Sequence, residues 1–250
     1  MFRIIPRLDI KPPCLIKGIN LEGVKKIGDP RVYGHKYFEE GADEIFFQDI
    51  TASLYGRNAF YQLVNETAGK VYVPLTVGGG IRCIEDARSA FQNGADRVAI
   101  NSAGILNPDL VAELVDLYGS QAVVGVIEAA GTVENSSWEV VFFSGRERSG
   151  LGVVDWAKKL ENLGVGELVI TSVPHEGLMN GCNLGLMKEV REAINLPLIA
   201  HGGIGNVSHV LDLAHSGVDG VVIASALHYS KCSIQELKSG LSNKGVEVRV

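Results

Sequence analysis

The sequence lacks any uncharged apolar run long enough to cross a bilayer, and its first residues do not contain the apolar core of a signal peptide. Basic residues are not in excess, because 23 Lys and Arg stand against 29 Asp and Glu, for a formal net charge of −6. A broad surface for nucleic acid or membranes would need excess positive charge. We therefore expect a cytoplasmic protein with no membrane partner and no nucleic-acid partner.

Cysteine motifs and linker segments are also absent. The four cysteines lie far apart in the chain, without a CxxC pair, at Cys14, Cys83, Cys182 and Cys232. We interpret them as free thiols in a reducing compartment, and we expect no metal site. No GxGxxG motif stands between a strand and a helix, so we expect no dinucleotide and no other cofactor. No Pro- or Ser-rich stretch and no charge block divides the 250 residues, which predicts a single domain.

Short β-branched segments alternate with longer amphipathic segments along the whole chain. The predicted strands are residues 2–5, 44–49, 73–77, 97–100, 122–127, 167–171, 198–200 and 220–223. Predicted helices lie between them, for example at 83–93, 108–118, 154–163 and 183–194. Apolar strands that alternate with helices form parallel βαβ units. Eight such units predict an α/β fold with a closed (β/α)8 (TIM) barrel, and residues 139–143 predict part of a hairpin inserted after the fifth strand.

Glycine is the residue type in excess, with 30 in 250 residues against an average of roughly 7%. Several glycine motifs recur at an offset of 123 residues. Residues 41–44 recur at 164–167, 79–81 at 202–204, 94–96 at 217–219, and 101–103 at 224–226. This repeat predicts that the barrel consists of two fused half-barrels, approximately 1–121 and 122–250.

The repeated glycines follow predicted strands and precede predicted helices, together with Ser102 and Ser225. Glycine at such a turn allows backbone N–H groups to approach an anion, and the helix N-terminus adds its dipole. Barrels of this kind bind phosphate after strands seven and eight, and the repeat places an equivalent site after strands three and four. We therefore expect a ligand with a phosphate at each end. The alternative is that these glycines only permit tight turns.

Acidic residues follow three predicted strands, at Asp9, Asp49 and Glu128. Asp9 and Glu128 belong to the first strand of each half, so we expect them to face each other across the mouth of the barrel. Two opposed carboxylates can catalyse proton transfer when their surroundings separate their pKa values. The alternative is that each carboxylate caps a helix or pairs with a lysine, for which Lys17 is a candidate.

Further motifs carry a family resemblance over essentially the whole chain. They lie at residues 3–9, 16–18, 28–30, 49–53, 76–80, 100–103, 119–121, 166–172 and 246–250. In these segments the sequence resembles the cyclase subunit of imidazole glycerol phosphate synthase. That family takes ammonia from a separate glutaminase subunit. With it, the cyclase converts a phosphoribulosyl formimino nucleotide into imidazole glycerol phosphate and aminoimidazole carboxamide ribotide.

The resemblance implies roles for individual residues. Asp9 would be a general acid or base, with Glu128 in the position of the family's second catalytic Asp. One phosphate would be held by Gly80, Asn101 and Ser102, and the other by Gly177, Gly203 and Ser225. Further substrate contacts are expected at Lys17, Asp49 and Thr171.

The resemblance also implies a heterodimer with the glutaminase, docked where the barrel strands begin. Ammonia would pass through the barrel interior and a ring of charges at Arg3, Glu44, Arg97 and Glu167. Without the resemblance, these four residues would be interpreted as ordinary ion pairs at strand starts.

The sequence departs from the family pattern at the catalytic face. Glu128 replaces an Asp and is followed by Ala129-Ala130 instead of Ala-Lys, residues 174–178 replace an Asp-Arg-Asp-Gly-Thr motif, and His201 replaces a Ser. One extra methylene displaces a carboxylate by about an ångström, enough to slow catalysis roughly a hundredfold. The first hypothesis is the ammonia-dependent cyclase. The alternative is a diverged paralogue that delivers ammonia to a sugar amidotransferase in surface-polysaccharide synthesis, and a third is a non-catalytic phosphate-binding scaffold.

Overall fold

The computed structural model of the chain describes residues 1–50, 58–131 and 137–249. Residues 51–53 and Val250, which belong to motifs of the family resemblance, lie outside this range. Residues 135 and 136, which precede the predicted hairpin, also lie outside it.

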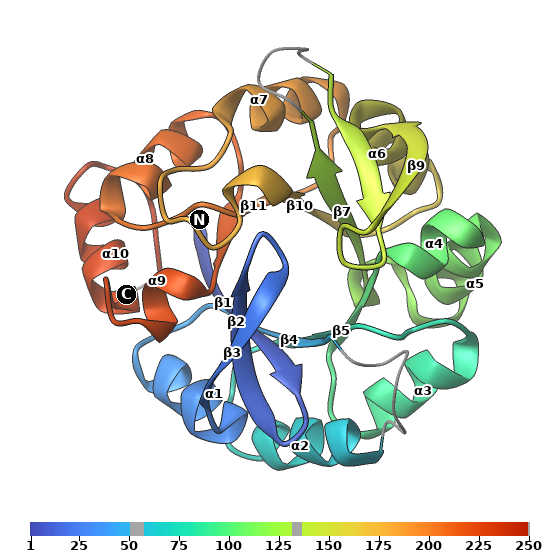
Figure 1. Ribbon diagram of the computed structural model, residues 1–250, viewed down its shortest axis with the longest axis horizontal. Coiled ribbons are helices and arrows are strands. Elements are labelled where there is room, and N and C mark those ends of the chain that lie inside the picture. The colour runs from blue at the N-terminus through green and yellow to red at the C-terminus, as the bar shows by residue number, and fades with distance from the viewer. Residues whose placement is uncertain (51–57, 132–136, 250) are drawn as a thin grey trace.

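A closed barrel of parallel strands forms the centre of the described structure (Figure 1). Its eight strands are β1 (Arg3–Lys11), β4 (Ile45–Asp49), β5 (Leu75–Gly78), β6 (Arg97–Ile100), β7 (Val123–Ala130), β10 (Glu167–Ser172), β11 (Leu198–His201) and β12 (Gly220–Ile223). Each pairs in parallel with the next, and β10 pairs with β7 to close the ring. The predicted (β/α)8 barrel is therefore confirmed. The carboxyl ends of these eight strands lie on one side of the barrel, which we call the mouth.

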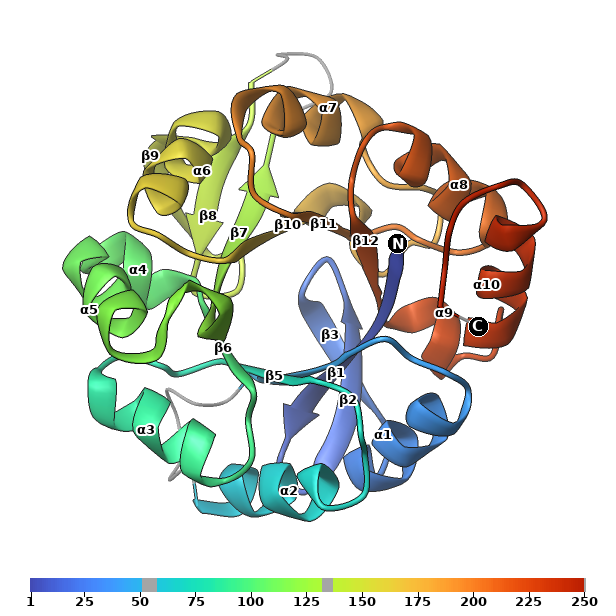
Figure 2. The same ribbon diagram turned by 180° about the vertical axis from the view of Figure 1, so that it is seen from behind.

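Helices surround the ring of strands, as Figure 2 shows from the opposite side. They are α1 (Pro30–Glu39), α2 (Asn58–Ala68), α3 (Ile84–Gln92), α4 (Ser102–Leu106), α5 (Pro108–Tyr118), α6 (Val153–Asn162), α7 (Leu184–Ala193), α8 (Val207–His215), α9 (Ser225–His228) and α10 (Ile234–Ser242). Polar side chains begin several of them: Asn183 caps α7, Asn206 caps α8, and Ser233 forms a capping box with Glu236 in α10. Such caps satisfy backbone N–H groups that have no partner inside the helix.

Two hairpins extend the sheet at the mouth. The strands β8 (Glu139–Phe142) and β9 (Glu147–Gly152) follow β7, which confirms the predicted hairpin. The strands β2 (Cys14–Ile19) and β3 (Glu22–Gly28) form a second hairpin, which the sequence analysis did not predict. Strand β1 continues to Lys11 and pairs with β2, so Asp9 lies within a strand and not at its end.

The core has two parts, because each barrel strand presents one face to the helices and the other to the interior. The larger part lies between the sheet and the helices. The smaller fills the middle of the barrel, with Ile5, Phe46, Ala99, Val124, Val126, Val169, Ile199 and Val222. Polar side chains lie in the interior above and below this apolar layer.

The backbone shows the repeat in the glycine turns. Gly79 and Gly202 have φ values of 88° and 100°, and Gly80 and Gly203 have 65° and 81°. The short helices α4 and α9 both begin one residue after the end-of-strand turns at Asn101 and Ala224. Equivalent turns therefore stand at the same offset as the sequence repeat.

Candidate active site at the barrel mouth

Asp9 is held between two cations at the mouth. Its Oδ1 accepts a hydrogen bond from Arg7 Nε at 2.8 Å, and its Oδ2 lies 3.1 Å from Lys17 Nζ. Lys17 also pairs with Glu176, and all four side chains are buried. Burial opposes ionisation of Asp9, but Arg7 and Lys17 outweigh it and hold the pKa of Asp9 well below its usual range. Lys17 is thus a partner of Asp9, one of the two roles open to it from the sequence.

Glu128 lies in the same buried cluster but has the opposite electrostatic environment. Burial raises the pKa of Glu128 to about 7, and the positive charge of Arg7 offsets only part of that effect. Its carboxyl accepts a hydrogen bond from the Gly145 N–H at 3.0 Å and interacts with Asn101 and Asp9. Near neutral pH Asp9 is thus ionised while Glu128 is partly protonated, and such separated pKa values are the arrangement that acid–base catalysis uses.

Arg7 was not among the residues selected from the sequence. It lies two residues from Asp9 and two from Ile5 on β1, so strand alternation directs it into the barrel. It is only 5% exposed, and its guanidinium carbon lies 5.8 Å from the centre of the Phe46 ring. The two-residue alternation of side chains along β1 is the sequence signal that could have identified Arg7 as an inward-facing residue. Glu176 was noted only as a departure from the family motif, and no local pattern shows its contact with Lys17.

The residues predicted to hold the first phosphate surround the ends of β4, β5 and β6. Ser102 Oγ accepts a hydrogen bond from the Phe143 N–H at 3.0 Å, so the β8–β9 turn contacts this half-buried serine. Asn101 Oδ1 is buried and has no hydrogen-bond partner within the described ranges. Asp49 is buried, and a Cβ on Gly79, beside Gly80, would lie 2.0 Å from the Asp49 carbonyl oxygen. The glycine here is required by the packing of these two turns, whatever they bind.

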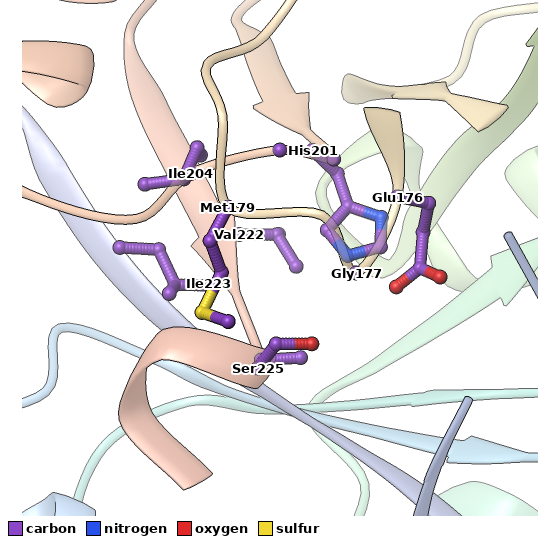
Figure 3. Close-up of a pocket in the computed structure, with 11 residues that line it drawn as sticks. Glu176, Gly177, Met179, His201, Ile204, Val222, Ile223 and Ser225 are labelled. Atoms are coloured by element: carbon purple, nitrogen blue, oxygen red, sulfur yellow. The ribbon is translucent and has the colours of Figure 1, made fainter. Parts of the chain in front are cut away.

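The residues predicted to hold the second phosphate line one pocket, which Figure 3 shows. Gly177, Gly203 and Ser225 meet there with His201 and Met179. The Met179 side chain points toward Ile223 and Ser225 (Figure 3), and the space left for water is about 10 Å³. That is about the space of one water molecule, so a phosphate would require these side chains to move.

Thr171 and His201 form a neutral pair beside this pocket. Thr171 Oγ1 and His201 Nδ1 are 3.1 Å apart, and both side chains are buried. Burial, with Arg7 and Lys17 nearby, holds the pKa of His201 well below its usual value. His201 is therefore an uncharged imidazole at neutral pH. Thr171, which was predicted to contact substrate, orients it.

The four residues of the predicted charge ring lie together where the strands begin. Arg3 pairs with Glu167 and lies 3.7 Å from Glu44. Arg97 lies 3.0 Å from Glu44 and 3.4 Å from Glu167. Thr76 Oγ1 donates a hydrogen bond to Glu44, whose pKa is raised mainly by burial. Each arginine thus bridges both carboxylates across the closed end of the interior.

Residues 1–50, 58–131 and 137–249 hold neither a cluster of metal ligands nor a membrane-spanning helix. No group of three or more His, Cys, Asp or Glu side chains there is arranged to hold a metal ion. No helix there is long and apolar enough to cross a membrane.

The fold and site together define the class of this protein. It is a (β/α)8 barrel of the enzyme type, in which ionisable residues and glycine turns gather at the carboxyl ends of the strands. The model of the histidine biosynthesis protein family matches residues 3–233, and the chain belongs to that family. This membership agrees with the resemblance to the cyclase.

Proposed function

We propose that this chain is the ammonia-receiving barrel of a two-subunit glutamine amidotransferase, with a glutaminase docked where the barrel strands begin. The observation that carries the proposal is the ring of Arg3, Glu44, Arg97 and Glu167. These residues come from four different strand starts and meet at the end of the interior. In the family that the sequence resembles, ammonia enters the barrel at this ring.

The barrel interior above the ring is compatible with neutral ammonia. It is lined by the apolar cluster that includes Ile5, Phe46 and Val169. An ammonium ion would lose its hydration in this apolar interior, so its entry is unfavourable. The combination supports a path for NH₃ and not for NH₄⁺.

The first candidate acceptor for this ammonia is the phosphoribulosyl formimino nucleotide, as in the cyclase. Asp9 and Glu128 support it, because they lie in one cluster with well-separated pKa values. The two sets of glycine turns also support it. In this mechanism Glu128 would exchange protons near neutral pH, while Asp9 would remain an anion.

The filled mouth favours the second candidate, delivery of ammonia to a sugar amidotransferase. Arg7 and Met179 occupy space at the mouth, and the β8–β9 turn occupies the hydroxyl of Ser102 through a hydrogen bond. A bisphosphate nucleotide would have to displace all three. We therefore favour an ammonia-delivery barrel that has lost the fit to this substrate.

An assay with ammonium distinguishes the two candidates. The protein is mixed with the phosphoribulosyl formimino nucleotide and a high ammonium concentration, and loss of the nucleotide is followed. We expect no turnover. Turnover that disappears in Asp9→Asn would establish the cyclase and overturn ammonia delivery.

A second experiment tests docking: the barrel is run on size exclusion with the glutaminase subunit of a synthase of this family. A complex is expected, and its absence would contradict the ammonia-receiving role.

A further inference from the structure

The guanidinium of Arg7 has hydrogen-bonding capacity that the protein does not use. Only Nε donates a hydrogen bond, to Asp9, and the two terminal nitrogens have no hydrogen-bond partner among the described residues. The residue is only 5% exposed, but its terminal nitrogens are not among the fully buried polar atoms that lack a partner, so they are open to the mouth. These N–H groups are available to a ligand that displaces water.

An unsatisfied acceptor belongs to another neighbour of Glu128. Asn101 Oδ1 is buried and accepts no hydrogen bond from a described residue. Arg7 and Asn101 both interact with Glu128, Arg7 through its charge and Asn101 through a side-chain hydrogen bond. The mouth therefore presents a cationic donor and an unused neutral acceptor that share one neighbour.

We propose that Arg7 and Asn101 form a binding site for a small hydroxy acid, such as a sugar acid, whose carboxylate pairs with Arg7. A planar guanidinium offers two parallel N–H groups, the arrangement that carboxylates match. A hydroxyl near that carboxylate would donate to Asn101 Oδ1. This inference rests on the proposed function, because it names the acceptor chemistry at the ammonia-delivering mouth.

The charges at the mouth favour a monoanion over a phosphate dianion. Arg7 and Lys17 are balanced by Asp9 and Glu176, while Glu128 is partly protonated near neutral pH. A single ligand carboxylate can bind the terminal nitrogens of Arg7 while Asp9 keeps its hydrogen bond to Nε. A second negative charge on the ligand would face the acidic side chains of Asp9, Glu128 and Glu176. Among the described residues that contact these three, Arg7 and Lys17 are the cations, and both are already balanced.

Entry of the ligand requires the β2–β3 hairpin to move. Lys17 belongs to this hairpin, and Glu176 accepts hydrogen bonds from its tip, at Leu21 N through Oε2 and at Asn20 N through the backbone oxygen. The ligand would thus be enclosed once the hairpin returns. Water exclusion would strengthen the Arg7–carboxylate pair.

The test is an NMR titration of the full chain without a glutaminase. The probes are D-glucuronate and acetate, with D-glucose and acetamide as neutral counterparts and D-glucose 6-phosphate as the dianion. We expect saturable shifts with both carboxylates, tighter binding of glucuronate than of acetate, and no saturation with the neutral compounds. The Arg7 Nε–H signal, identified by its loss in Arg7→Lys, should shift with the carboxylates.

Variants identify the residue responsible. Arg7→Met should weaken glucuronate binding by about ten- to hundredfold, because hydrogen bonds to a charged group are lost. Arg7→Lys, which keeps the charge if Arg7→Met does not fold, should weaken it less. Arg82→Met, on an exposed arginine, should have no effect.

Two results would overturn the inference. The first is that glucuronate does not bind, or that it binds wild type, Arg7→Met and Arg7→Lys with equal affinity. The other is tighter binding of glucose 6-phosphate that Arg7→Met leaves unchanged, which would assign anion binding to the glycine turns. Neither result depends on glutaminase docking or on the ammonium assay, so failure of the inference is distinguishable from failure of the proposed function.

Discussion

Asp9 and Glu128 illustrate how neighbouring side chains separate two similar groups. Both are buried carboxyls at the same end of the barrel. Asp9 has a cation on each oxygen, whereas Glu128 has the Gly145 N–H, the Asn101 side chain and an arginine that is not hydrogen-bonded to it. Coulombic attraction falls with distance, so only Asp9 recovers the cost of its desolvation.

The raised pKa of Glu128 predicts a pH-dependent effect of Glu128→Gln on stability. Folding strengthens proton binding to Glu128, so the native side chain costs stability as the pH rises from about 4.5 to about 7. Replacing it with neutral Gln should therefore raise stability above pH 7, by up to about 3 kcal/mol. Urea unfolding of wild type and variant at pH 5 and pH 8 measures this.

Two controls belong to this experiment. His201 and His228, whose pKa values are lowered by burial, change stability in the opposite direction over the same pH range. The difference between variant and wild type removes their contribution. Glu189→Gln, on the exposed surface of α7, should change stability equally at both pH values. A difference for Glu128→Gln that does not grow with pH would contradict the environment described here.

At the scale of elements, the β2–β3 hairpin is held at the mouth by the pairing of β2 with β1 and by contacts of both Lys17 and the tip with Glu176. Glu176 follows the turn after β10, yet it pairs with Lys17 on β2 and receives the Leu21 N–H at 3.3 Å. Strand β3 itself is largely exposed and pairs only with β2 among the described strands. The hairpin should therefore open more easily than the barrel.

Glu176→Gln should loosen this hairpin without unfolding the barrel. The change removes the charge that pairs with Lys17, and the cost of losing a charged hydrogen bond is about 1.5 kcal/mol or more. Hydrogen exchange of the hairpin amides should accelerate by about tenfold, while amides of β10 and β11 should be unaffected. The matched control is Glu22→Gln, an exposed residue of β3. Equal exchange in both variants would show that Glu176 does not hold the hairpin.

At the scale of the whole molecule, the charge ring joins strand starts that are distant in the chain. Glu167 is shared by Arg3 and Arg97, so Glu167→Gln leaves two partly buried arginines with one carboxylate, Glu44. Breaking such a pair by removing one partner destabilises the protein. We expect Glu167→Gln to lower the free energy of unfolding, measured by heat or urea, by about 2 kcal/mol. The control variant Glu189→Gln should not lower it.

The ring variant also tests the ammonia path. In complex with a glutaminase, Glu167→Gln should reduce transfer of glutamine-derived ammonia more than it reduces glutamine hydrolysis. If Glu167→Gln lowers stability as expected but leaves ammonia transfer unchanged, the ring stabilises the barrel and has no part in the ammonia path.

Much of the barrel follows from local pattern. Apolar strands of three to six residues between amphipathic helices predicted all eight barrel strands, because burial on both faces leaves a continuous apolar run. The 123-residue repeat placed the glycine turns, the predicted strand ends singled out Asp9 and Glu128, and the family resemblance singled out the charge ring. The β2–β3 hairpin was missed because β3 has exposed side chains on both faces and so lacks the apolar pattern of a buried strand.

The sequence by itself determined the barrel, its repeat and the residues that stand at each end of its strands, because these depend on neighbours a few positions away. Only the tertiary structure decided which of those residues interact. Lys17 and Glu176 are 159 positions apart, and Arg3 and Glu167 are 164 apart. The protonation of Asp9 and Glu128, and the space left at the mouth, depend on such contacts. Electrostatic energy and packing act through distance in space, which the order of residues does not contain.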